Sequence, residues 1–143
     1  MKTLELKLDT KYFDDVKSGK KDFEIRKNDR DFEVGDILEL KKYKSYKNGK
    51  KPHYVRTDSD SVLKTYNSDR ADTIKVKVKS IIKAESWNMD KDFTDPLIFE
   101  GKMIFKHGIS GVSKVLKEYF GSEYVPDGYV VMKIEVVPVE EKE

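Results

Sequence analysis

Cysteine is absent from the chain, and histidine occurs only twice. The lack of cysteine excludes disulfide scaffolds, thiol catalysis, zinc ribbons and iron–sulfur clusters. Neither His53 nor His107 has metal-ligand spacing, so we expect no metal and no cofactor. No apolar run approaches the roughly 18 residues that a membrane helix needs, and no apolar signal segment opens the chain. We therefore expect a cytoplasmic protein that has no membrane partner.

An excess of one charge is also missing, because 29 basic and 27 acidic residues leave a net charge of +2. Charged residues make up 39% of the chain, well above the roughly 25% of an average domain. The 37% of apolar residues suffices for one hydrophobic core. A chain of 143 residues usually forms one domain, so we expect a single domain over 1–143 with a frayed tail at 140–143.

The spacing of apolar residues predicts at least five strands and two helices. Apolar residues that alternate with polar ones indicate strands at 4–8, 22–26 and 73–81. Apolar residues that follow turn signals indicate two more strands, at 37–40 and 129–137. Helical spacing indicates helices from Thr10 to Gly19 and from Ser110 to Gly121. The order has no repeating βαβ unit, which predicts an α+β fold or a small barrel. Two long insertions, at about 44–72 and 87–108, complete the expected organisation; the first contains a brief strand at 53–55, and the second a hairpin or packed segment at 97–105.

The most informative segment for function is 19–29. If residues 22–26 form a strand, Phe23 and Ile25 point inward, and Glu24 and Arg26 share the opposite face about 6.6 Å apart. A carboxylate beside a guanidinium can read the edges of a nucleobase or hold a phosphate, and Lys21 adds a mobile cation. The alternative is an exposed ion pair worth less than about 1 kcal/mol. Both interpretations stay open at this point.

A second feature is a basic segment over residues 41–56, which carries seven basic and no acidic residues and has a net charge of +7. Aromatic residues interrupt it, and this mixture suits phosphate neutralisation and base stacking. The alternative is a solubilising loop that binds nothing. The residues that we assign to a nucleic-acid surface are Lys41, Lys42, Tyr43, Lys44, Tyr46, Lys47, Lys50, Lys51 and Arg56.

Gly19, Lys21, Glu24 and Arg26 together spell G-x-K-x-x-E-x-R. This motif resembles the signature of the ASCH (activating signal cointegrator homology) domain of the PUA-like superfamily, closest to an uncharacterised bacterial and phage subfamily. The similarity covers about 4–43, 73–82 and 128–137. It implies a small mixed β-barrel with two flanking helices and a cleft that is lined by the signature. Relatives of this kind bind RNA or modified bases, and some are amidohydrolases that act on acetylated cytidine.

Three positions depart from that family. Leu4 stands where the subfamily often has a histidine, and Asp22 stands where a threonine is common. Glu24 replaces the threonine nucleophile of the amidohydrolase branch, so that mechanism does not carry over to this chain.

The leading hypothesis is a non-enzymatic RNA- or nucleotide-binding module in which Lys21, Arg26 and Lys27 contact the ligand. Glu24 then accepts a hydrogen bond from a base or orients Arg26. The alternative is a metal-independent hydrolase of a modified nucleoside that uses Lys21 and Glu24 as a base/acid pair. In this hypothesis burial raises the pKa of Glu24 so that it activates a water, and Lys21 stabilises the developing oxyanion. A third possibility is a protein-interaction domain that uses residues 87–108, with Leu97, Ile98, Phe99 and Met103 exposed. The sequence leaves the oligomeric state open.

Overall fold

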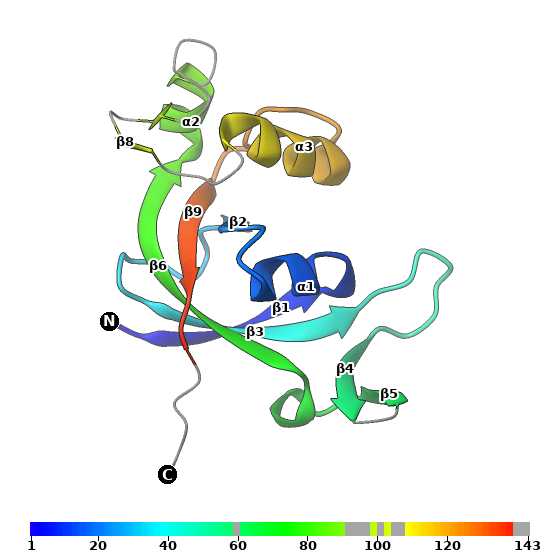
Figure 1. Ribbon diagram of the computed structural model, residues 1–143. Coiled ribbons are helices and arrows are strands. Elements are labelled where there is room, and N and C mark those ends of the chain that lie inside the picture. Colours follow the sequence, from blue (N-terminus) through cyan, green and yellow to red (C-terminus); the bar gives the residue numbers. More distant parts are fainter. Residues whose placement is uncertain (59–60, 91–97, 100–101, 104–107, 139–143) are drawn as a thin grey trace.

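The computed structural model describes residues 1–58, 61–90, 98–99, 102–103 and 108–138, and it contains nine strands and three α-helices in that part of the chain (Figure 1). The strands are β1 (Thr3–Asp9), β2 (Phe23–Lys27), β3 (Ile37–Lys44), β4 (His53–Asp58), β5 (Ser61–Thr65), β6 (Thr73–Lys83), β7 (Ile98–Phe99), β8 (Lys102–Met103) and β9 (Tyr129–Val136). The helices are α1 (Thr10–Lys17), α2 (Ala84–Asp90) and α3 (Gly108–Phe120), with one 3₁₀ turn at Ser68–Arg70.

Seven of these strands form one twisted sheet, in which β2, β9, β6 and β3 follow one another as antiparallel neighbours. The first strand, β1, is parallel to β3 along its whole length. The β4–β5 hairpin continues from the end of β3. The chain therefore has the expected α+β fold, with a mostly antiparallel sheet.

The expected closed barrel is wrong. Among the described residues, β1 pairs only with β3 and β2 pairs only with β9, and no backbone ladder joins β1 to β2. A bulge between Val78 and Ser80 bends the long strand β6, which adds to the curvature of the sheet. The result is a curved but open sheet. In the described part of the chain its edge strands are β1, β2 and β5.

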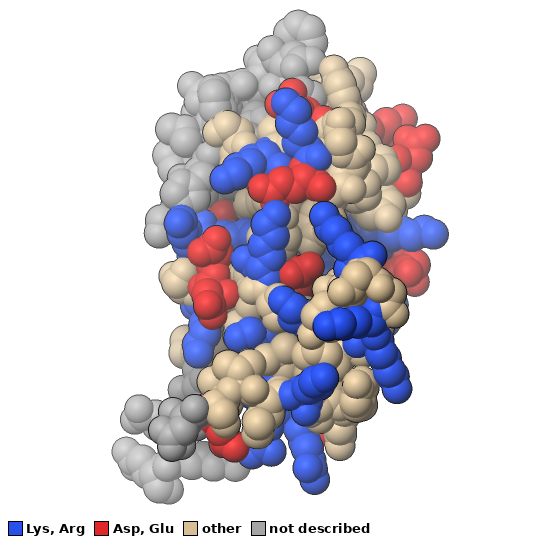
Figure 2. All heavy atoms as spheres, turned by 90° about the vertical axis from the view of Figure 1, so that its right-hand side faces the viewer, with Lys and Arg blue, Asp and Glu red and all other residues tan. Residues whose placement is uncertain are grey.

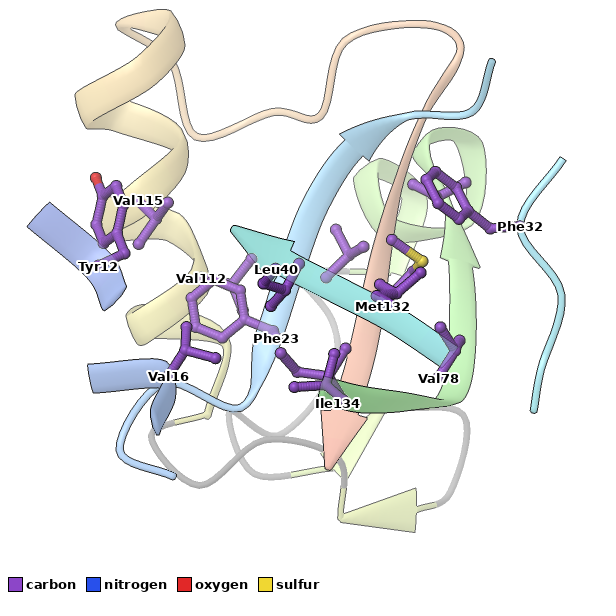
Figure 3. Close-up of a cluster of buried hydrophobic side chains, with 14 of the residues drawn as sticks. Tyr12, Val16, Phe23, Phe32, Leu40, Val78, Val112, Val115, Met132 and Ile134 are labelled. Carbon is purple, nitrogen blue, oxygen red and sulfur yellow. The ribbon is translucent and has the colours of Figure 1, made fainter. Parts of the chain in front are cut away.

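The hydrophobic core lies between this curved sheet and helices α1 and α3 (Figure 3). Tyr12 and Val16 point from α1 toward Val112 and Val115 of α3, and Phe23 of β2 lies beneath them. The strands contribute Leu40, Val78, Met132 and Ile134 from the opposite side. Each of these elements is amphipathic, and burial of its apolar side fixes which side remains polar.

The five strands expected from the sequence are confirmed, but the insertions differ from expectation. The segment 44–72 holds the β4–β5 hairpin and a 3₁₀ turn instead of a single brief strand. A third helix, α2, begins at Ala84, and β7 pairs with β8 as the expected hairpin. Asp9, not Thr10, is the N-cap of α1. The tail 140–143 lies outside the described residues, as does Leu97, and the side chains of Ile98, Phe99 and Met103 are also not described.

None of the helices in the described ranges combines the length and apolar character that a membrane crossing requires. The longest of them is α3, with 13 residues. Its apolar residues Val112, Val115 and Leu116 are all buried in the core of the domain. The hydrophobic side of this helix is therefore used within the domain itself.

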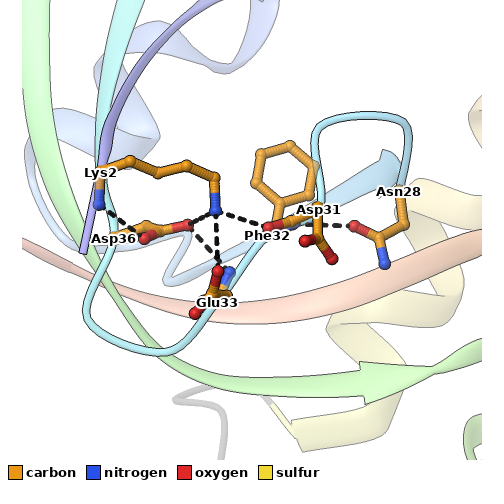
Figure 4. A network of polar contacts seen from close by, with 6 residues as sticks. All are labelled: Lys2, Asn28, Asp31, Phe32, Glu33 and Asp36. Carbon is orange, nitrogen blue, oxygen red and sulfur yellow. Dashed lines mark hydrogen bonds and ion pairs between the residues drawn. The ribbon is translucent and has the colours of Figure 1, made fainter.

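A buried carboxylate fixes the start of β1 against the loop that joins β2 to β3 (Figure 4). Asp36 has no exposed surface, and it accepts hydrogen bonds from the backbone and the side-chain nitrogen of Lys2 at 3.0 and 2.9 Å. The Glu33 backbone N–H donates to the same carboxylate at 2.9 Å. Lys2 also donates to the Asp31 carbonyl at 2.6 Å, where the backbone has a positive φ of 51°. This network determines the path of the loop that follows β2.

We expect Asp36→Asn to lower the free energy of unfolding by about 1–2 kcal/mol, because an amide presents N–H donors to groups that are themselves donors. Chemical denaturation monitored by circular dichroism measures the change. Glu33→Gln is the matched control, since this exposed carboxylate contacts the same ammonium group at 3.4 Å. We expect the control to stay within about 0.5 kcal/mol of wild type. Equal stability of the two variants would contradict the role given to Asp36.

Candidate functional site

The signature residues come together at the open edge formed by β2. Only 3% of the surface of Glu24 is exposed. Its strand neighbour Phe23, which points to the opposite face of the sheet, is also buried, so β2 is covered on both faces at this point. The Glu24 carboxylate accepts hydrogen bonds from Lys21 Nζ at 3.0 Å and from Arg26 Nε at 2.7 Å. The exposed ion pair considered from the sequence is therefore wrong, because this acid is enclosed between two cations.

Lys21 reaches Glu24 from the turn that connects α1 to β2. Gly19 adopts a φ of 81° in that turn, a conformation that other residues rarely tolerate, and the chain reverses there into β2. The Lys21 ammonium also donates to the Phe23 carbonyl at 2.7 Å and lies 4.6 Å from the centre of the Phe23 ring. The ring of Tyr12 lies 5.2 Å from the same ammonium. These contacts make Lys21 a fixed cation instead of the mobile one expected from the sequence.

Arg26 connects β2 to β1, two of the edge strands of the sheet. Its Nε donates to Glu24, and a terminal nitrogen donates to the Lys7 carbonyl of β1 at 2.7 Å. The side chain of Arg26 is 24% exposed, whereas those of Lys21 and Glu24 are 10% and 4% exposed. Arg26 is therefore the member of this cluster that a ligand reaches most easily.

The electrostatics of the cluster keep Glu24 ionised. Burial alone would raise the pKa of this carboxyl, but the charges of Lys21 and Arg26 and their hydrogen bonds outweigh burial and lower it. The hydrolase hypothesis needs Glu24 to act as a base whose pKa is raised by burial, and that condition is not met. A carboxylate held by two cations is well suited to orient Arg26.

A first cavity of about 250 Å³ opens beside this cluster, and aromatic rings form much of its wall. Tyr12, Tyr119, Phe120 and Tyr129 line it together with Lys21, Glu24 and Arg26. The rings lie in a row, with centroids 5.6 Å apart from Tyr12 to Tyr119 and 5.2 Å apart from Phe120 to Tyr129. Tyr119 and Phe120 are exposed at 55% and 38%. A planar group that enters the cavity can therefore stack on an aromatic surface and reach a guanidinium.

The Tyr12 hydroxyl already has a partner in the protein, because it donates a hydrogen bond to the carboxylate of Glu118 in α3. Burial, together with this hydrogen bond, raises the pKa of Tyr12 above its ordinary value, and the hydrogen bonds from Tyr12 and Lys11 lower the pKa of Glu118. Burial also raises the pKa of Tyr119 to about 12. Near neutral pH the two tyrosine hydroxyls therefore stay neutral, and the Glu118 carboxylate stays negatively charged.

A second cavity of about 450 Å³ lies next to Arg26, and residues of both β1 and β2 form part of its wall. It shares Lys7, Ile25, Arg26 and Tyr129 with the first cavity. The remaining residues of its wall are Glu5, Leu6, Lys27, Asp29, Arg30, Phe32 and Tyr54. Lys27, which the sequence also assigned to the ligand, is exposed and lies in this second cavity, away from Lys21 and Glu24.

The basic segment 41–56 forms the end of β3, the following loop and β4, and it is only partly the surface expected from the sequence. Lys41 is buried at 7% exposure, because β3 is an interior strand and places Lys41 between Lys7 and Thr73 of its neighbours. Its assignment to a nucleic-acid surface is therefore wrong. Lys42 is half-buried, with its ammonium 5.0 Å from the centre of the Phe13 ring.

The aromatic residues of this segment contact one another. The Tyr43 ring meets Tyr54 edge to face at 5.0 Å, and the Tyr46 hydroxyl contacts His53 Nε2 at 2.7 Å. Five basic side chains of the segment remain exposed: Lys44, Lys47, Lys50, Lys51 and Arg56. Figure 2 shows one face of the molecule, on which basic groups are numerous and acidic groups lie between them. Lys51 lies 4.4 Å from the centre of the Tyr66 ring.

Sequence reasoning missed the aromatic wall. It did not include Tyr12, Tyr119 or Phe120 among the candidate site residues. One signal could have found part of the wall, because Tyr119 and Phe120 are adjacent and neighbouring helical residues point in directions about 100° apart. One of the two therefore had to project from the core. Lys7 could not be found, since it contributes its backbone carbonyl.

Among the residues that the structure describes, no group of three or more His, Asp or Glu side chains is arranged to hold a metal ion. The acidic groups beside the first cavity are Asp9 and Glu24, and Glu24 is already engaged by two cations. The donor set at the site is therefore one of nitrogen cations and aromatic rings. Such a set suits an anionic or acceptor-rich organic ligand.

We expect Glu24→Gln to destabilise the protein by about 2–4 kcal/mol at neutral pH, because it leaves two cations facing each other with partial access to solvent. The lowered pKa of Glu24 means that its contribution is present above its ordinary value of 4.5 and is lost as the pH falls through the folded-state pKa. Melting temperatures measured from neutral to acid pH should therefore fall less steeply for Glu24→Gln than for wild type.

Glu135→Gln is the control for this variant, because Glu135 is also on a strand and its exposed carboxylate pairs with Lys79 at 3.7 Å. We expect its melting curve to follow wild type at every pH. If Glu24→Gln also followed wild type, the assignment of a stabilising buried ion cluster would be incorrect.

Comparison with known proteins gives a family and similarity to solved structures. Residues 3–94, more than half of the chain, match the family described as "Domain of unknown function (DUF3850)". The crystal structure of the hypothetical protein PH0355 is similar, with 23% identity and a TM-score of 0.45, over 96% of this chain and 100% of that one. No curated protein matches the sequence.

Proposed function

The chain belongs to the DUF3850 family, and we propose that it binds single-stranded RNA through the first cavity, where Arg26 is held in place by the buried Glu24. In this proposal a nucleobase stacks on the aromatic wall and its phosphate or polar edge contacts Arg26. The observation that carries it is a guanidinium with free donors beside exposed aromatic rings. The ASCH resemblance of the signature motif supports the same assignment, and relationship to the PUA-like superfamily is part of the proposal.

The fold fits this proposal in a modified form. A PUA-like barrel implies a cleft at the signature, and here the corresponding strands leave an open edge that the Arg26 side chain spans to Lys7. In this proposal the open sheet carries one side-chain bridge at the place where a barrel would have its closing ladder. The bridge leaves space on either side of Arg26, and a ligand can enter there.

The hydrogen-bonding capacity of the cluster favours an acceptor ligand. Arg26 has five N–H donors and uses two on Glu24 and Lys7, so three remain. Lys21 has three donors and uses two on Glu24 and the Phe23 carbonyl, so one remains. One acid against two bases leaves a net charge of +1 on the cluster. Phosphate oxygens and the acceptor edges of bases match this pattern.

The size and lining of the cavity favour a nucleotide over a large cofactor. Small-molecule pockets usually measure about 300–1,000 Å³, and this cavity is slightly smaller, which suits one nucleotide unit. Aromatic side chains bind the bases of single strands by stacking, with little dependence on sequence. The exposed lysines of the segment 44–56 give the approaching strand a region of positive potential.

We expect Arg26→Ala to lower the affinity for a single-stranded RNA of about twelve nucleotides by roughly tenfold or more, because a charged contact is lost. Fluorescence anisotropy across a salt series should also show a salt slope that is smaller by about 1. Arg70→Ala removes an exposed arginine that lines neither the first cavity nor its neighbour around Lys27, and it should bind like wild type. Because Arg26→Ala also weakens the ion cluster, binding is measured below the melting temperature of each variant.

A second variant separates binding from folding. Tyr119 is 55% exposed, so Tyr119→Ala should fold normally and still lose about 1–3 kcal/mol of stacking energy. Uridine- and adenosine-rich strands are tested alongside single-stranded DNA of the same length. Absence of RNA binding by wild type at low salt, or unchanged binding in both cavity variants, overturns the proposal.

A further inference from the structure

The two cavities lie on either side of one side-chain bridge. They share Lys7, Ile25, Arg26 and Tyr129, so one continuous groove crosses the gap between β1 and β2. Arg26 lies at the junction, with its terminal nitrogen on the Lys7 carbonyl and part of its guanidinium exposed. A ligand that fills only the first cavity leaves the second cavity, with its own charges, unused.

The two halves of the groove differ in chemistry. The first cavity has four aromatic rings and a nearly balanced set of charges. The second cavity has four basic residues, Lys7, Arg26, Lys27 and Arg30, against the two acids Glu5 and Asp29. It therefore carries the greater positive charge. The first half suits a base, and the second suits the backbone of an adjoining nucleotide.

The second cavity also connects the groove to the basic segment. Tyr54 of β4 lines it, and the Tyr54 ring contacts Tyr43 edge to face. The Lys7 ammonium lies 4.6 Å from the centre of the Tyr43 ring. A strand that leaves the groove on this side therefore passes a tyrosine and continues toward the exposed lysines beyond β3.

On these grounds we infer that the ligand is a single strand of at least two adjacent nucleotides, with one base in the aromatic cavity, the linking phosphate at Arg26 and the next nucleotide in the basic cavity. This inference rests on the proposed function, and it adds that an isolated nucleotide is an incomplete ligand. Arg30 becomes a contact to the second nucleotide, and Tyr119 remains a contact to the first.

Isothermal titration calorimetry with uridine 5′-monophosphate and with the 5′-phosphorylated dinucleotide pUpU tests this directly, with the adenosine pair pA and pApA run in parallel. We expect each dinucleotide to bind roughly tenfold or more tightly than its mononucleotide, because it fills both cavities. Arg30→Ala should weaken dinucleotide binding about threefold to tenfold and leave mononucleotide binding unchanged. Tyr119→Ala should weaken both, and Arg70→Ala neither.

The outcomes separate the two claims. Mononucleotides and dinucleotides that bind with equal affinity, in wild type and in Arg30→Ala, overturn the inference but leave the proposed function standing. Failure of wild type to bind any of the four nucleotides or a longer strand overturns both. Arg30 is exposed, and its side chain forms no hydrogen bond or ion pair within the part of the chain that the structure describes, so loss of folding is not expected for its variant.

Discussion

The buried carboxylate of Glu24 is the interaction on which this arrangement depends. Desolvation of a lone carboxylate costs several kcal/mol. Here Lys21 and Arg26 offset that cost, because each is a cation and donates a short hydrogen bond to the Glu24 carboxylate. The three side chains belong to the turn after α1 and to β2, and Arg26 extends the cluster to β1. Each cation is thereby placed and oriented before any ligand arrives, and the cost of ordering it is already met by folding.

The open sheet edge and the groove are two aspects of one geometry. Unpaired strand edges expose backbone groups that attract other strands, and proteins usually cover them. Here Arg26 satisfies one such group, the Lys7 carbonyl, and α3 places Tyr119 and Phe120 beside the gap. A closed ladder would satisfy more backbone groups, but it would leave no space between β1 and β2. The side-chain bridge keeps the edges in place and leaves that space open.

The fold was largely predictable from sequence, because the alternation in β1 and β6 reflects burial on one side of a sheet, and the apolar run of β9 reflects burial of successive residues in an interior strand. The grouping of Lys21, Glu24 and Arg26 also followed from their spacing. The burial of Glu24 could not be predicted in this way. Alternation places Glu24 opposite Phe23, on the side expected to be exposed to solvent, and the residues of α1, α3 and β1 that lie around the cluster are distant from it in the sequence. The assignment of Lys41 to a surface was wrong for a related reason. The neighbouring strands that make β3 an interior strand cannot be identified from the sequence of β3 itself.

The place of β9 in the sheet has a consequence for how the chain acquires its structure during synthesis. β9 lies between β2 and β6, and its residue Lys133 pairs with Phe23, which the ribosome delivers 110 residues earlier. Until β9 has been synthesised, β2 lacks the strand with which it pairs, and the Lys21–Glu24–Arg26 cluster is not anchored to the sheet through β2. The nascent polypeptide therefore carries β2 as an unpaired strand until residues 129–136 have been synthesised, and the groove assembles only after that.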